Sequence, residues 1–169
     1  MEGTKLDLKR AQIDGDNYGP SDVYTDKVEC VPFALAALII MYVEDEKGGP
    51  NKLKESIEWR MRSALEDKDE FSRDSSKLWA TAEERILQLY KWWTVERPKL
   101  MNRESELLEK WSKSRGLEDT SDLENRLNAP DTPRSRELFE AHTDLGERIR
   151  AEMQEFCHGV IDIREFLWT

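Results

Sequence analysis

Apolar side chains recur along this chain at steps of three and four residues, which is the spacing of one face of an α-helix. The pattern is clearest near the C-terminus, at Leu138, His142, Leu145, Ile149, Met153, Phe156, Val160, Ile163 and Leu167. These eight steps cover 29 residues, from 138 to 167, so their mean is close to the roughly 3.6 residues of a helical turn. We predict one long C-terminal helix that packs in a bundle, because a two-stranded coiled coil needs a strict mean of about 3.5.

The most apolar stretch, residues 31 to 43, predicts a central helix that ends at Gly48-Gly49-Pro50. Pro32 either falls in the first turn of this helix, where proline is tolerated, or kinks it. The stretch holds 13 residues. Because crossing a bilayer needs about 20 apolar residues, we interpret it as a buried core helix.

Asn51 is expected to cap a second helix, whose apolar face consists of Leu53, Ile57, Met61 and Leu65. Residues 67 to 76 form a charged break, after which Ser75 or Ser76 is expected to cap a third helix. The apolar face of that helix consists of Trp79, Ala82, Ile86, Leu89 and Trp93. Pro98 is expected to end it.

A fourth helix is predicted from Asn102 to a stop at Gly116, and residues 119 to 128 fit a further short one. Thr132 and Pro133 then give a strong start signal for the last helix. A threonine at the N-cap accepts hydrogen bonds from free backbone N–H groups, and proline is favoured at the first helical position.

The pattern therefore predicts an all-α protein, a single-domain helical bundle of about five helices over residues 21 to 169, with a long C-terminal helix. Residues 1 to 20 are polar and carry Gly15, Gly19 and Pro20, which predicts an N-terminal polar arm. The sequence contains no sustained alternation of apolar and polar residues and no Asn-Gly hairpin signal, so it predicts no sheet.

Trp92 and Trp93 are adjacent, and neighbours on a helix point about 100° apart, so the two rings cannot share one core face. Trp93 completes the apolar face of the third helix and is predicted to lie in the core. Trp92 falls on the flank that carries Arg85, Gln88 and Glu96. Either another helix of the bundle or another molecule is expected to cover it.

The chain carries 36 acidic and 26 basic residues, a net charge of -10. This charge argues against direct binding to nucleic acid or to an anionic membrane, since both need a basic surface. It permits binding to a basic protein, including mimicry of a nucleic acid, although acidity also serves solubility alone. Cys30 and Cys157 are interpreted as buried reduced thiols, and the N-terminus lacks the pattern of an export signal.

Four carboxylates are the candidates for a metal site, at Glu83, Glu84, Glu152 and Glu155. All-α Mg-dependent nucleotide pyrophosphohydrolases bind metal with carboxylates at such spacings on facing helices, because a hard cation needs several converging oxygens. A carboxylate-metal enzyme that hydrolyses nucleotides is therefore the alternative function. In a chain with 36 acidic residues such spacings arise by chance, so we favour solvated helix faces and no cofactor.

Other catalytic signals are weak. His142, Cys157, His158 and Cys30 lack zinc-ligand spacing, since adjacent ligands on a helix point apart. Cys157 inside a helix is poorly placed for an activated thiolate. The eight glycines fit turns and caps and form no phosphate-binding loop. No catalytic residue is nominated.

Two short motifs point to a family. They are Leu89-Tyr90, Trp92-Trp93-Thr94 and Arg97-Pro98 in the middle of the chain, and Asp162, Arg164 and Leu167-Trp168-Thr169 at its end. They resemble a group of small acidic proteins of tailed bacteriophages, in which a Tyr-x-Trp-Trp…Arg-Pro helix end precedes a variable polar segment and a last helix that finishes in Leu-Trp-Thr. The resemblance implies phage origin and a place in the host cytoplasm or the virion. It implies no catalytic residues, because the group has no established activity.

The favoured function is that of a non-enzymatic protein-binding module, an inhibitor of a host or defence factor or a virion accessory. It would present an acidic helical surface with exposed tryptophan, because tryptophan is enriched at interface anchors. The candidate partner-binding residues are Trp59, Trp92, Arg97 and Trp168. The expected partner is a host or phage protein, with homo-oligomers allowed, and not nucleic acid or membrane.

Overall fold

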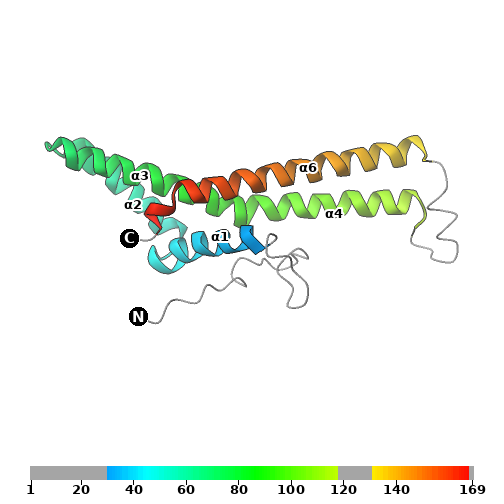
Figure 1. The fold of residues 1–169 in the computed structure, drawn as a ribbon, viewed down its shortest axis with the longest axis horizontal. Helices are drawn as coiled ribbons and strands as arrows, with labels where there is room; N and C mark the ends of the chain where they lie inside the picture. Colours follow the sequence, from blue (N-terminus) through cyan, green and yellow to red (C-terminus); the bar gives the residue numbers. More distant parts are fainter. Residues whose placement is uncertain (1–29, 118–130, 168–169) are drawn as a thin grey trace. The chain divides into compact units, whose positions relative to one another are not determined.

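A computed structural model describes residues 30–117 and 131–167 of the chain, and every regular element in them is helical (Figure 1). No strand occurs among these residues, and the predicted all-α class is confirmed. Three predictions lie outside the described residues: the N-terminal arm over 1–20, the short helix over 119–128, and the role of Trp168.

The described residues form α-helices and shorter π-helical and 3₁₀ segments. The α-helices are α1 (Cys30–Met41), α2 (Pro50–Glu66), α3 (Glu70–Lys91), α4 (Arg97–Ser114) and α6 (Pro133–Asp162). The π-helical segments, whose turns are wider, are η2 (Tyr42–Glu46) and η3 (Trp92–Glu96). The 3₁₀ segment, whose turn is tighter, is η5 (Arg164–Phe166).

Backbone contacts divide the chain into two compact units. Unit 1 runs to Val95 and resumes at Gln154, so it holds α1, η2, α2, α3, most of η3, the end of α6 and η5. Unit 2 covers Glu96–Met153 and holds α4 and the rest of α6. The single domain predicted over residues 21–169 stays a prediction.

In unit 1, α2 and α3 form an antiparallel hairpin with a very short connection (Figure 1). Asp69 caps α3, because its carboxylate accepts the backbone N–H of Ser72 at 2.8 Å, and Asp67 accepts the Ser72 hydroxyl at 2.5 Å. The predicted charged break over 67–76 with a cap at Ser75 or Ser76 is wrong. The aspartates satisfy the first turn directly, so the charged residues that follow are accommodated within the helix.

The passage from α1 to α2 uses a wide turn followed by two glycines. In η2 the backbone N–H of Lys47 donates to the carbonyl of Tyr42 at 3.0 Å, a bond across five residues. Gly48 and Gly49 then adopt φ angles of 73° and 108°, which favour glycine. The predicted glycine stop is confirmed, but α2 begins at Pro50 and not after a cap at Asn51.

Aromatic rings fill the core of unit 1 around Trp93, which is fully buried as predicted. The Phe33 ring meets Trp93 edge-on at 5.3 Å between ring centroids, and the Phe156 ring lies at 5.1 Å. Phe156 also stacks on Trp92, with centroids 5.3 Å apart and planes at 27°. The last helix of the same chain therefore covers one face of Trp92.

The predicted stop at Pro98 is wrong, and so is the predicted start at Asn102. Helix α3 passes into η3, and α4 begins at Arg97 with Pro98 in its first turn. A proline ring inside a regular helix clashes with the carbonyl four residues earlier and removes one hydrogen bond. The π-helical turn inserts an extra residue before the proline, and the first turn of a helix does not need the missing N–H.

In unit 2, α4 and α6 run antiparallel (Figure 1), and the rings of Trp111 and Phe139 meet at 5.6 Å. As predicted, Gly116 stops the fourth helix: α4 ends at Ser114, and Gly116 adopts a φ of 66° just after it. As predicted, Thr132 caps α6: its hydroxyl accepts the backbone N–H of Ser135 at 3.0 Å, and Pro133 follows as the first helical residue.

Two glycines of α6 stand in different surroundings. A Cβ placed on buried Gly159 would lie 2.9 Å from Nη2 of Arg85 and 3.0 Å from Cδ2 of Leu89, so α6 approaches α3 closely here. A Cβ on Gly146 would meet Oε1 of Glu104 at 2.9 Å, which is the far end of a flexible side chain. Only the first contact is with a packed apolar group.

We therefore expect Gly159→Ala to lower the free energy of unfolding by about 1–2 kcal/mol, because overpacking outweighs the gain in helix propensity. Gly146→Ala is the matched control. Its Glu104 neighbour can rotate away, so the same propensity gain should leave stability unchanged or raise it by up to about 1 kcal/mol. Urea unfolding measures both, and equal shifts would contradict the close packing of α6 on α3.

Candidate functional site

The most unusual side chain in the structure is Glu83 of α3, which is 0% exposed. Its Oε1 accepts a hydrogen bond from Nζ of Lys47 at 2.9 Å. Its Oε2 accepts from Oγ of Ser56 at 2.9 Å and from Nε of Arg60 at 3.2 Å. We call these four residues the Glu83 cluster; they join the segment after η2 to α2 and α3.

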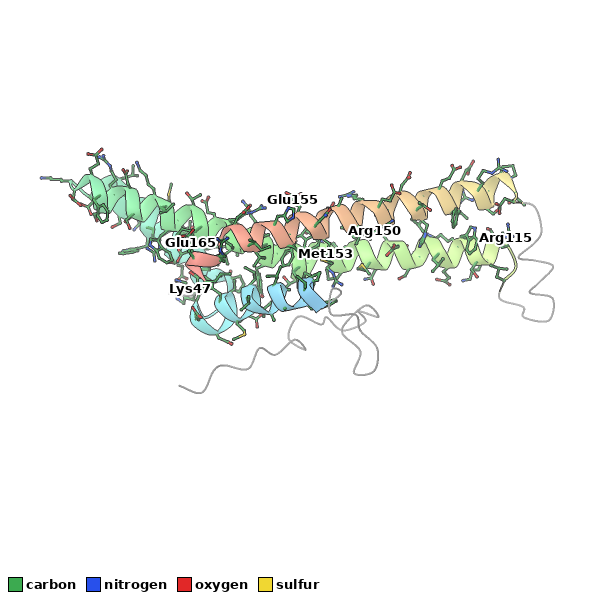
Figure 2. The ribbon with its side chains drawn as sticks, in the orientation of Figure 1. Lys47, Arg115, Arg150, Met153, Glu155 and Glu165 are labelled. Carbon is green, nitrogen blue, oxygen red and sulfur yellow. The ribbon has the colours of Figure 1, made fainter. Side chains whose placement is uncertain are left out.

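Local structure explains why these groups converge. Ser56 and Arg60 are four residues apart, so they lie on the same face of α2, next to the buried Leu53 and Ile57. Lys47 follows the wide turn of η2, at the bend that precedes α2 (Figure 2). The bend and the hairpin thus place the side chains of Lys47, Arg60 and Ser56 next to the Glu83 carboxylate.

The electrostatics of the cluster favour the charged forms. Burial alone lowers the pKa of Lys47, but hydrogen bonding to Glu83 and the neighbouring Tyr42 outweigh burial and raise it above its usual range. The Nζ of Lys47 also lies 5.1 Å from the centroid of the Tyr42 ring. Burial raises the pKa of Tyr42. At neutral pH the cluster therefore holds Lys47 charged beside a neutral phenol.

The cluster extends through aromatic rings toward the C-terminal segment. The guanidinium of Arg60 lies over the Trp79 ring, 5.2 Å from its centroid. The Phe166 ring of η5 meets Trp79 edge-on, with centroids 4.9 Å apart and planes at 85°. A continuous set of contacts therefore runs from the buried carboxylate to η5.

The four carboxylates considered for metal binding are in different environments. Both oxygens of Glu83 are occupied by donors, whereas the adjacent Glu84 is exposed. Glu152 accepts from Nε of Arg148 at 2.7 Å, and Glu155 is exposed on α6 (Figure 2). Over residues 30–117 and 131–167, no group of three or more His, Cys, Asp or Glu is arranged to hold a metal ion. Magnesium binding belongs only to the alternative function, and the expectation of no cofactor stays a prediction.

The remaining nucleophile candidate does not acquire the properties of an active thiol. Cys157 is half-buried in α6, and burial raises its pKa, which disfavours the thiolate. Of the two histidines, His142 is half-buried and His158 is exposed. In the part of the chain that the structure describes, no helix is both long enough and apolar enough to pass through a bilayer.

The candidate partner-binding residues differ in their exposure to solvent. Trp59 is 62% exposed on α2. Trp92 is half-buried against Phe156, and Arg97 is 2% exposed, so the Arg97 side chain contributes no surface. Trp168 lies outside the described residues. Trp59 is thus the candidate that presents a large aromatic surface to solvent.

Three apolar side chains of the α2–α3 hairpin are exposed although sequence reasoning did not expect it, and one of them, Leu65, was predicted on the apolar face of the second helix. Leu65 is 85% exposed and Phe71 83% exposed, on either side of the connection, and Leu78 is 58% exposed. The spacing of Phe71 and Leu78, seven residues apart, was the available signal, since it places both on one face of α3. The predicted break over 67–76 concealed that face.

A second contact joins α3 to η2. The hydroxyl of Tyr90 donates to Oε1 of Glu44 at 3.0 Å. Burial, together with the adjacent Glu44 carboxylate, raises the pKa of Tyr90 to about 12. The neutral phenol is therefore the form that the folded protein stabilises.

Comparison of the chain with models of known protein families, with curated proteins and with solved structures found no match.

Replacing Glu83 with glutamine keeps the shape of the side chain but leaves Lys47 and Arg60 without their anion. We expect Glu83→Gln to lower the free energy of unfolding by about 3 kcal/mol, near the low end for broken buried pairs because both cations are partly exposed. Glu84→Gln, at the exposed neighbouring position, should change it by less than about 0.5 kcal/mol. Urea unfolding compares the two, and similar effects would refute a special role for Glu83.

Tyr90 makes stability depend on pH in the alkaline range. Its folded pKa of about 12 exceeds the ordinary value of 10.0, so the unfolded chain loses this proton first. The contribution is complete below pH 10 and is lost as pH rises toward 12, on the order of 1 kcal/mol after solvent screening. We expect Tyr90→Phe to remove this part of the pH dependence of the free energy of unfolding, which urea unfolding measures between pH 9 and 12. An unchanged slope would contradict the assignment.

Proposed function

We propose that this chain is a bacteriophage protein that acts by binding another protein, of the host cell or of the virion, and not by catalysis. The observation that carries the proposal is the exposure of Trp59, at 62% of its surface, on a regular stretch of α2. A rigid helix presents the indole at little cost in conformational freedom, and indoles of this kind anchor protein interfaces.

The surroundings of Trp59 resemble the rim of an interface. Glu55 lies four residues before it and Arg62 three residues after it, so both flank the indole on α2, with the half-buried Ser56 and Ser63. A tryptophan surrounded by mixed charges and hydroxyls fits the usual pattern of an apolar anchor inside a polar rim. This supports a protein partner.

Charge is distributed differently from the prediction of an acidic helical surface. The described residues 30–117 and 131–167 contain 25 acidic and 21 basic side chains, a net charge of -4. The remaining -6 of the total of -10 therefore belongs to residues 1–29 and 118–130. Residues 50–91, which form the α2–α3 hairpin, carry nine of each sign. We therefore assign recognition to the aromatic anchor and not to net acidity.

The phage assignment rests on the Tyr-x-Trp-Trp…Arg-Pro and Leu-Trp-Thr motifs, and it places the protein in the host cytoplasm or the virion. The first motif falls where α3 passes through η3 into α4. The proposal includes the predicted single-domain bundle of about five helices, with the long helix α6 as its C-terminal member. In this proposal the Glu83 cluster supports the hairpin that carries Trp59.

A capture experiment with purified protein tests the role of Trp59. We expect Trp59→Ala to weaken binding of the partner captured from host lysate by about thirtyfold or more, as for an interface anchor, with Trp59→Phe intermediate. Leu65→Ala is the matched control, because it truncates an even more exposed apolar side chain on the same helix. Affinity of the purified partner is measured by calorimetry. Equal affinity of Trp59→Ala and the wild type would sink the proposal.

A further inference from the structure

The fold holds the side chain of Arg60 in one orientation, while the outer edge of its guanidinium stays open. The Nε of Arg60 donates to Oε2 of the buried Glu83 at 3.2 Å, and the guanidinium lies 5.2 Å from the centroid of the Trp79 ring. The first contact fixes one edge of the planar group, and the second fixes its face. Because arginine loses much conformational freedom when a partner immobilises it, a guanidinium that the fold already holds binds at lower cost.

The open part of this guanidinium is the edge that carries Nη1 and Nη2. Neither nitrogen hydrogen-bonds to a described residue, and neither is buried without a partner. Because 23% of the Arg60 side chain is exposed, these two nitrogens face solvent. Their N–H groups form a planar fork, which matches the two oxygens of one acid group.

The open edge of Arg60 lies beside the proposed aromatic anchor. Trp59 and Arg60 are consecutive on α2, so their side chains point about 100° apart. Ser56 and Ser63 are each three or four residues from both, which places them on the helix surface between the two side chains. Both serines are small and half-buried. A partner that covers the indole therefore reaches the guanidinium without displacing a large side chain.

Charge indicates which kind of acid fits this edge. Lys47 and Arg60 bring two positive charges to the single negative charge of Glu83, so one positive charge is left over. The exposed Glu58, two residues before Arg60, opposes a group that carries two negative charges. A carboxylate, with one negative charge and two acceptor oxygens, therefore fits better than a phosphate.

We propose that Arg60 binds a carboxylate of the protein partner through Nη1 and Nη2, next to the pocket in which that partner receives Trp59. The partner then carries an aspartate, a glutamate or its own C-terminus at this position, and Glu83 acts as the positioning residue for Arg60. The inference rests on the proposed function, because it names the chemistry of the partner that Trp59 anchors. Arg62, on the other flank of Trp59, is exposed, and no ion pair with a described residue holds it in place.

A displayed library of random peptides, selected on the immobilised full chain, supplies probes of known sequence. We expect the enriched peptides to share an acidic residue next to apolar residues and to lose binding to Trp59→Ala. Enriched peptides that need Trp59 but share no acidic residue would overturn this inference and leave the proposed function standing. Enriched peptides that bind Trp59→Ala as well as the wild type would contradict the proposed function, and this inference with it.

The affinities of one enriched peptide then test the ion pair itself. Arg60→Lys keeps a cation for Glu83 but loses the planar fork, so it should raise the dissociation constant by about tenfold. Arg62→Lys is the matched control and should change the dissociation constant by about twofold at most. Circular dichroism confirms that each variant is folded.

A change in the peptide completes the test. Replacing its acidic residue by the corresponding amide should weaken binding to the wild type by about tenfold and binding to Arg60→Lys by about twofold or less, because the amide removes the group that Arg60 binds. Equal losses in the two proteins would show that Arg60 does not contact the acid. That result, or tighter binding of a peptide with phosphoserine at the acidic position, would overturn the proposal.

Discussion

A carboxylate buried inside a helical protein is stable only while donors and cations compensate its lost hydration. Glu83 imposes that requirement on unit 1, because none of its surface reaches solvent. Lys47 and Arg60 supply the charges and Ser56 a hydroxyl. Any slip of α2 along α3, or a different turn after η2, would leave the anion unpaired. The cluster therefore fixes the register of the hairpin more strictly than interchangeable apolar contacts could.

The contacts around Glu83 also affect which side chains of the hairpin can bind a partner. Arg60 binds Glu83 on one side and lies over Trp79 on the other, and Trp79 receives the edge of Phe166. Hairpin and C-terminal segment are thus connected through polar and aromatic contacts. Because these contacts hold α2 and α3 together, the exposed apolar side chains of the hairpin are not needed for its core. They are available for binding, which is the basis of the proposed function.

The helical pattern was predictable from the sequence, since apolar spacing and caps are local properties. The stripe of α6 is largely buried at the predicted positions, and the start at Thr132 and the stop at Gly116 are confirmed. Trp93 was correctly assigned to the core, and the cover of Trp92 proves to be Phe156 of the same chain. That last contact links positions 64 residues apart, from 92 to 156, and no local pattern reveals it.

The predictions for Pro98 and Glu83 were wrong for physical reasons. A wide π-helical turn depends on tertiary packing and has no simple sequence signal, so the passage through Pro98 was unforeseen. Glu83 was grouped with Glu84 as a solvated pair. Its spacing from the buried Ala80 and Leu87, three residues before and four after, marked it as inward-facing. A charged residue at an apolar position of the helical period was the signal to follow.

The most direct test of this account is a double-mutant cycle between Glu83 and Lys47, read by urea unfolding. In the wild type, Lys47→Met should destabilise the fold, because it leaves the buried carboxylate with fewer compensating charges. In the Glu83→Gln background the same change should be neutral or stabilising, which gives a coupling energy of about 1–3 kcal/mol. Additive effects, with coupling below about 0.5 kcal/mol, would show that the buried carboxylate does not organise the hairpin.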